Sequence, residues 1–217
     1  MKSEDKAARD LDELGETFLG MLLGDVIAAD ERIKTLGDQA SRRDFIRTSF
    51  AAIEGLVWTY RENVFSAAET LDELTPDLEF VFSEKSYVVT ESGKLVSQPK
   101  YVSLTAMVRL TTNLAKTLSS DVVAEFGGEG WESLKKAVKI RNRLTHPKSR
   151  TDLIVDARDI DVCWTALLWL GELTTDVTQA TLRRQTSHLK FLRAFVADLK
   201  SGHPLALELY EQAKARG

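Results

Sequence analysis

Three residues near the end of a predicted helix have side chains suited to chemistry on a phosphate group. Arg141, Asn142 and His146 lie in the run KIRNRLTHPK, residues 139–148. A histidine titrates near neutral pH and can accept or donate a proton. An arginine binds phosphate oxygens through two parallel hydrogen bonds, and an asparagine beside it can orient the histidine or hold the phosphate. We therefore interpret this trio as a candidate site for proton transfer beside a bound phosphate.

The same stretch is basic, although the whole chain has a net charge of −4. Residues 131–150 contain seven basic residues and one acidic residue, whereas residues 1–40 contain five basic and ten acidic residues. A local basic block can attract a polyanion. The alternative is that this block is an ordinary solvent-exposed helix face that binds no ligand. The candidates for binding the polyanion are Lys139, Arg143, Lys148 and Arg150.

The predicted helix that carries the trio runs from about residue 130 to about Thr145, where Pro147 disfavours its continuation. Arg141 follows Leu134 by seven residues and therefore lies on or beside the apolar stripe of this helix. A charge there needs a partner or must line a cleft. Arg141 and His146 are five residues apart, which separates them around an ideal helix. They can converge only if the helix ends between them or if two protomers meet.

Each member of the trio also has a structural interpretation, which the sequence leaves open. Arg141 could bond the carbonyl groups of a neighbouring helix or pair with a core carboxylate. His146 could be a helix C-terminal residue favoured by the helix dipole. Arg183 and His188 repeat the spacing of Arg141 and His146, but no asparagine follows Arg183, so this second pair is an internal control.

Composition narrows the class of protein. One cysteine excludes an intramolecular disulfide, and three histidines without ligand spacing predict no metal site and no cofactor. The N-terminal residues do not form a secretory signal, and the most apolar stretch, residues 162–170, is too short to span a bilayer. We therefore predict a soluble cytoplasmic protein with no membrane partner.

Helical spacing of apolar residues dominates the chain and predicts an all-α fold in a single domain, 1–217. Residues 79–98 differ, because they are rich in aromatic and β-branched residues and contain a glycine turn, so we expect a β-hairpin or extended arm there that includes Phe80 to Phe82. The helix predicted from about residue 156 ends in a polar tail, residues 174–185, and a further helix is predicted from about residue 189. The predicted helices span about 9–36, 41–71, 104–118, 130–145, 156–173 with the polar tail to 185, 189–199 and 205–213.

The run Arg141-Asn142-x-x-x-His146 resembles the signature of the HEPN superfamily (higher eukaryotes and prokaryotes nucleotide-binding), which consists of small helical bundles. The order of elements is also similar: long helices first, the motif near the end of a later helix, and then a very apolar helix. The resemblance covers about residues 40–180. The N-terminal helix (1–38), the 79–98 arm and the C-terminal helices (186–217) would be elaborations.

The resemblance implies an activity and partners. Many HEPN proteins are metal-independent endoribonucleases of toxin–antitoxin, abortive-infection and CRISPR-associated systems. It implies a homodimer in which Arg141, Asn142 and His146 of both chains form one composite site. Lys139, Arg143, Lys148 and Arg150 would hold the RNA substrate, and an antitoxin or another defence-system protein would be a further partner. The alternatives are a catalytically silent HEPN-like module that binds RNA or a nucleotide or serves in assembly, and an unrelated helical regulatory or adaptor protein.

Overall fold

Helices make up most of the chain, and a small antiparallel β-hairpin is inserted between two of them. The computed structural model describes residues 15–215. This arrangement confirms the predicted helical fold with an inserted hairpin. The elements are α2 (Phe18–Leu36), α3 (Gln39–Thr70), α4 (Pro76–Phe82), β1 (Lys85–Val89), β2 (Leu95–Pro99), α5 (Leu104–Leu118), α6 (Glu129–Thr145), a 3-10 helix η1 (Arg150–Leu153), α7 (Ala157–Ser201) and α8 (Pro204–Lys214).

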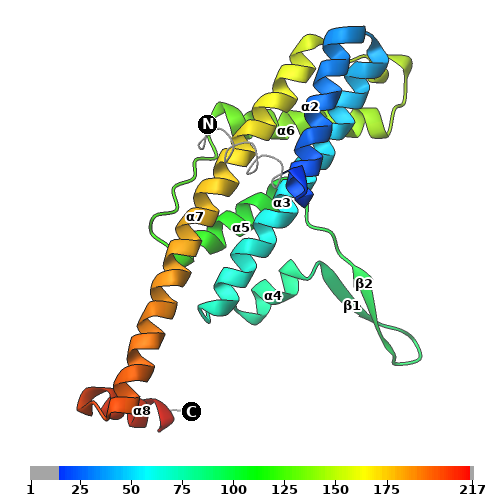
Figure 1. Cartoon of the computed structure of the whole chain (residues 1–217). Helices are drawn as coiled ribbons and strands as arrows, with labels where there is room; N and C mark the ends of the chain where they lie inside the picture. Colours follow the sequence, from blue (N-terminus) through cyan, green and yellow to red (C-terminus); the bar gives the residue numbers. More distant parts are fainter. Residues whose placement is uncertain (1–14, 216–217) are drawn as a thin grey trace, which may run out of the picture.

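Two long helices, α3 and α7, form the centre of the fold. They pack against each other, α2 and α5 lie against α3, and α6 lies against both. The N-terminal part of α7 belongs to this bundle, whereas its C-terminal part extends away from it toward α8 (Figure 1). The apolar faces of the helices meet in one core around Phe45, Ile53, Leu134 and Leu170.

Short polar residues set the ends of the central helices. The Asp38 carboxylate accepts a hydrogen bond from the Ser41 backbone N–H and begins α3. Asp156 and Asp159 form a capping box that begins α7, which agrees with the predicted start of this helix at residue 156 or 157. All four prolines lie at element boundaries: Pro76 and Pro204 in the first turns of α4 and α8, Pro99 at the end of β2, and Pro147 just beyond α6.

The hairpin is shorter than the predicted arm. Lys85 pairs with Pro99 and Val89 with Leu95, and Gly93 adopts a positive φ of 74° in the connecting turn. The prediction that Phe80 to Phe82 belong to this arm is wrong, because these residues form the end of α4. Thr75 caps that helix, Pro76 occupies its first turn, and burial of Phe82 against Phe65 fixes it on α3.

The two helices predicted near the C-terminus form one continuous helix. α7 continues for 45 residues from Ala157 to Ser201, so the predicted break near residue 185 is wrong. Residues 174–185 contain neither glycine nor proline, and threonine hydroxyls in this stretch donate to carbonyl oxygens of the preceding turn. Polarity alone therefore does not end the helix. The predicted start of the first helix near Arg9 lies outside the described residues, and α2 begins at Phe18 after its cap Thr17.

The core explains residues that the sequence left without a role. The Tyr60 hydroxyl lies 2.8 Å from the Thr112 hydroxyl, and burial raises the pKa of Tyr60. Burial also raises the pKa of the Cys163 thiol to about 12, which makes this cysteine an inert core residue. Gly130 allows α6 to approach Trp169, since an added Cβ would clash with that ring.

Within residues 15–215, no helix combines the length and apolar character that crossing a membrane requires.

Candidate functional site at the C-terminal end of α6

α6 carries the predicted trio, and the fold positions it through one apolar face. Trp131, Leu134, Ala137, Ile140 and Leu144 are buried at steps of three and four residues, against α7 and α3. The helix ends at Thr145, and the next residue has non-helical angles. Both the predicted end of this helix and the role of the proline two residues later are confirmed.

Arg141 lies beside the buried stripe and contacts α3. Its guanidinium forms an ion pair with Glu54, lies 4.9 Å from the centre of the Phe50 ring, and donates to the Asn142 side chain at 3.1 Å. The Arg141 side chain is 35% exposed, and Glu54 is more exposed than that. The pairing predicted as an alternative is therefore present, but with a surface carboxylate rather than a core one.

His146 occupies the cap position at the end of α6. Its backbone N–H donates to the Asn142 carbonyl oxygen at 3.0 Å, and both side chains are exposed. Among the described residues, no hydrogen bond joins the Arg141 and His146 side chains. The structure thus places Asn142 and His146 next to each other in one turn, while Arg141 is turned toward α3.

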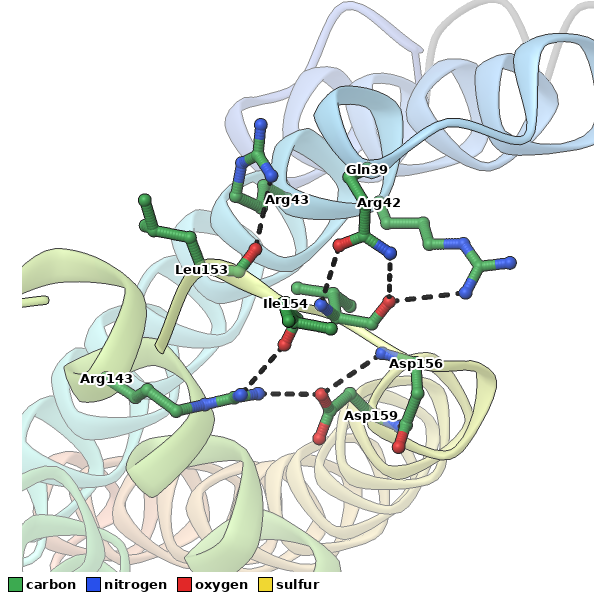
Figure 2. A network of polar contacts seen from close by, with 9 residues as sticks. Gln39, Arg42, Arg43, Arg143, Leu153, Ile154, Asp156 and Asp159 are labelled. Carbon is green, nitrogen blue, oxygen red and sulfur yellow. Dashed lines mark hydrogen bonds and ion pairs between the residues drawn. The ribbon is translucent and has the colours of Figure 1, made fainter. Parts of the chain in front are cut away.

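The predicted phosphate-binding residues divide into two groups. Lys139, Lys148 and Arg150 are exposed. Arg143 instead donates to the Ile154 carbonyl oxygen at 2.8 Å and to the Asp159 carboxylate at 2.7 Å (Figure 2). Arg143 therefore joins α6 to the start of α7, a structural role that sequence reasoning missed.

The loop after His146 is stabilised by hydrogen bonds among its own residues. The Asp152 carboxylate accepts hydrogen bonds from the backbone N–H groups of Lys148 and Ser149, each at 2.8 Å, and from the Ser149 hydroxyl at 3.0 Å. These bonds keep the pKa of Asp152 below its usual value. Lys148 and Arg150 are thereby presented on an ordered turn.

The same loop is also fastened to the start of α3. The Gln39 amide pairs with both backbone groups of Val155, at 2.9 Å and 2.8 Å. Arg42 donates to the Val155 carbonyl oxygen at 3.2 Å, and Arg43 to that of Leu153 at 3.1 Å (Figure 2). These contacts span more than a hundred residues of sequence, and no local pattern in the sequence indicates them.

A shallow cavity of about 440 Å³ lies on the α7 side of the candidate site. Lys139 and Arg143 line it together with Asp156 and Asp159, so its basic and acidic groups balance. Within the described part of the chain, no group of three or more histidine, cysteine, aspartate or glutamate side chains has an arrangement that could hold a metal ion. The His146 imidazole is a group suited to proton transfer, and the Arg141 guanidinium is a group suited to phosphate binding.

No protein-family model, curated protein or solved structure matches the chain. The likeness to the HEPN superfamily rests on the motif and on the order of the helices alone.

Proposed function

We propose that the protein is a metal-independent endoribonuclease of the HEPN type that acts as a homodimer, as a toxin or anti-phage defence effector. The observation that carries this proposal is the complete set of Arg141, Asn142 and His146 at the end of α6, with Asn142 and His146 exposed beside the basic turn that carries Lys148 and Arg150. An antitoxin or another defence-system protein would be its regulator.

The reaction uses the 2′-hydroxyl of RNA as its nucleophile. His146 of one protomer removes the proton of this hydroxyl, and the oxygen attacks the adjacent phosphorus. The 5′-oxygen leaves with a proton from the partner's His146, because one imidazole cannot serve both sides of an in-line displacement. The products are a 2′,3′-cyclic phosphate and a 5′-hydroxyl. RNA binding through Lys139, Lys148 and Arg150 weakens steeply with salt.

Arg141 would stabilise the charge on the pentacovalent phosphorus. A guanidinium has five N–H donors. Arg141 uses one for Glu54 and one for Asn142, so the other N–H groups remain for a phosphate. Glu54 would then fix the orientation of the guanidinium.

A catalytically silent HEPN-like module that binds RNA or a nucleotide, or that serves in assembly, is the second candidate. The observation that favours it is the ion pair of Arg141 with Glu54, which already compensates the charge that catalysis needs. Such a module would bind RNA without cleaving it.

The deciding experiment compares the wild type with His146→Ala on a mixed RNA pool in excess EDTA, with analysis of the RNA ends. His188→Ala is the matched control, because Arg183 precedes His188 at the same spacing. We expect the wild type and His188→Ala to yield cyclic-phosphate ends, and His146→Ala to lose at least a hundredfold in rate. Binding without cleavage by a folded, dimeric wild type would favour the silent module, and equal cleavage by all three proteins would exclude His146 from the site.

A further inference from the structure

A second cavity lies on the other side of Arg141, between α3 and the segment that leads from the hairpin into α5. Its volume is about 470 Å³. Val57, Leu104 and Met107 contribute apolar surface, and Trp58 and Tyr101 also line it. None of the sequence patterns indicated this cavity, because its walls come from separate parts of the chain.

Two ion pairs line this cavity. Arg141 pairs with Glu54, and Arg61 donates to Glu84 at 2.9 Å. Each guanidinium is matched by a carboxylate, so the two pairs contribute no net charge. A cavity that combines balanced polar groups with apolar surface suits a flat, neutral ligand with polar edges better than an isolated phosphate.

The two aromatic side chains that line this cavity are exposed to solvent. Trp58 is 52% exposed and Tyr101 is 82% exposed. The other tryptophans pack in or against the core. Exposed aromatic rings beside a cleft are the surfaces on which unpaired RNA bases stack.

Contacts with neighbouring residues hold the Trp58 ring and the backbone beside Tyr101 in place. The Phe18 ring of α2 contacts Trp58 edge-on, with ring centres 5.8 Å apart. The Glu84 carboxylate accepts hydrogen bonds from Arg61 and from the Val102 backbone N–H, each at 2.9 Å, which fixes the residue after Tyr101. Preformed walls reduce the entropy lost when a ligand binds.

We propose that this cavity binds one unstacked nucleobase of the RNA whose phosphate contacts Arg141. The base stacks on Trp58 and Tyr101. The second carboxylate oxygen of Glu54 has no hydrogen-bond partner among the described residues and accepts an N–H of the base edge. This inference rests on the proposed function, because its ligand is the substrate of the same site.

Tryptophan fluorescence tests the inference directly, since Trp58 is the most exposed tryptophan of the described chain. His146→Ala protein, which we expect to cleave at least a hundredfold more slowly, is titrated with a six-nucleotide unstructured RNA. We expect quenching that disappears in Trp58→Phe while binding persists. Trp58→Ala and Tyr101→Ala should weaken binding about tenfold, the equivalent of about 1.4 kcal/mol of lost stacking, whereas Tyr101→Phe should bind normally.

Tyr210→Ala is the matched control, because Tyr210 is a half-exposed tyrosine on α8, away from the cavity. An RNA duplex should not quench Trp58, because its bases stay stacked. Equal quenching by the duplex, or unchanged affinity in Trp58→Ala and Tyr101→Ala, would overturn the inference. These outcomes are separate from cleavage. If the wild type cleaves RNA but Trp58→Ala and Tyr101→Ala bind RNA with unchanged affinity, only the base-binding site is contradicted. If RNA quenches Trp58 but the wild type does not cleave, only the nuclease activity is contradicted.

Discussion

Two parts of the chain contain an arginine and a histidine with four residues between them, and the structure gives them different surroundings. Arg141 and His146 span the last turn of α6 and its cap. Arg183 and His188 lie inside α7, which continues to Ser201. Arg141 contacts Glu54 and Phe50, whereas the Arg183 side chain is largely exposed and lies 3.9 Å from Asp121.

The difference shows what spacing alone leaves out. Inside a regular helix, residues five apart point in different directions. At a helix end, the last residue leaves the helical path, and its side chain gains other directions. The proline after His146 supplies that end, whereas no proline or glycine lies between Arg183 and His188. The first pair therefore lies at a helix end, where Asn142 and His146 are exposed to solvent.

The largest expected effect separates the two arginines. Arg141→Ala should lower the rate of RNA cleavage by about a hundredfold to a thousandfold, as does loss of a donor that stabilises a developing negative charge. Arg183→Ala should change the rate less than twofold. The measurement is single-turnover cleavage of one labelled RNA by both variants. Similar losses in both would show that the helix end has no special role.

An intermediate effect concerns stability rather than activity. Arg143→Ala removes two charge-assisted contacts that join α6 to the start of α7, so we expect a loss of about 1–2 kcal/mol in the free energy of unfolding. Arg184→Ala, on the exposed part of α7, should change it by less than about 0.5 kcal/mol. Urea denaturation followed by circular dichroism measures both. If Arg143→Ala were as stable as the wild type, the arginine would be available for RNA instead.

The smallest effect is a pH dependence confined to the turn after His146. The pKa of Asp152 is lowered in the folded protein by the hydrogen bonds it accepts. Its stabilising effect is therefore complete above the unfolded-state value of about 3.9, and it is lost as the pH falls through the folded-state value. Between pH 5 and pH 3 the wild type should lose more stability than Asp152→Asn.

Ser149→Ala provides the control for that experiment. It removes the hydroxyl donor but leaves both backbone donors to Asp152 in place. Its pH dependence should therefore lie between those of the wild type and Asp152→Asn. Identical slopes in all three proteins would show that the turn does not depend on this carboxylate.

The sequence predicted the elements whose signals are local. Pro147 set the end of α6 and Asp156 the start of α7, because capping and proline sterics act within a few residues. The α4 segment was misassigned, since Phe80 to Phe82 have strand-forming side chains but follow a strong helix start at Thr75 and Pro76. The prediction divides α7 after about residue 185, but no glycine or proline lies between residues 174 and 201 to end the helix there.

The partners of the candidate site could not be predicted. Glu54 lies 87 residues before Arg141, and Gln39 lies 116 residues before Val155. The residues beside Arg143 in the sequence do not show whether its side chain is free on a basic surface or paired with a carboxylate. In the structure it pairs with Asp159. Such pairings depend on how α3, α6 and α7 pack, which periodicity does not specify.

The length of α7 has a consequence for how the protein opens. Its last buried residue is Thr181, and the residues from there to Ser201 are exposed or half-buried. The helix is thus continuous in geometry, but we expect only its first part to share the cooperative stability of the bundle. Amide hydrogens of the last five turns should exchange with deuterium through local fraying, while those near Leu170 should exchange only when the whole bundle unfolds. One helix therefore contains two levels of stability.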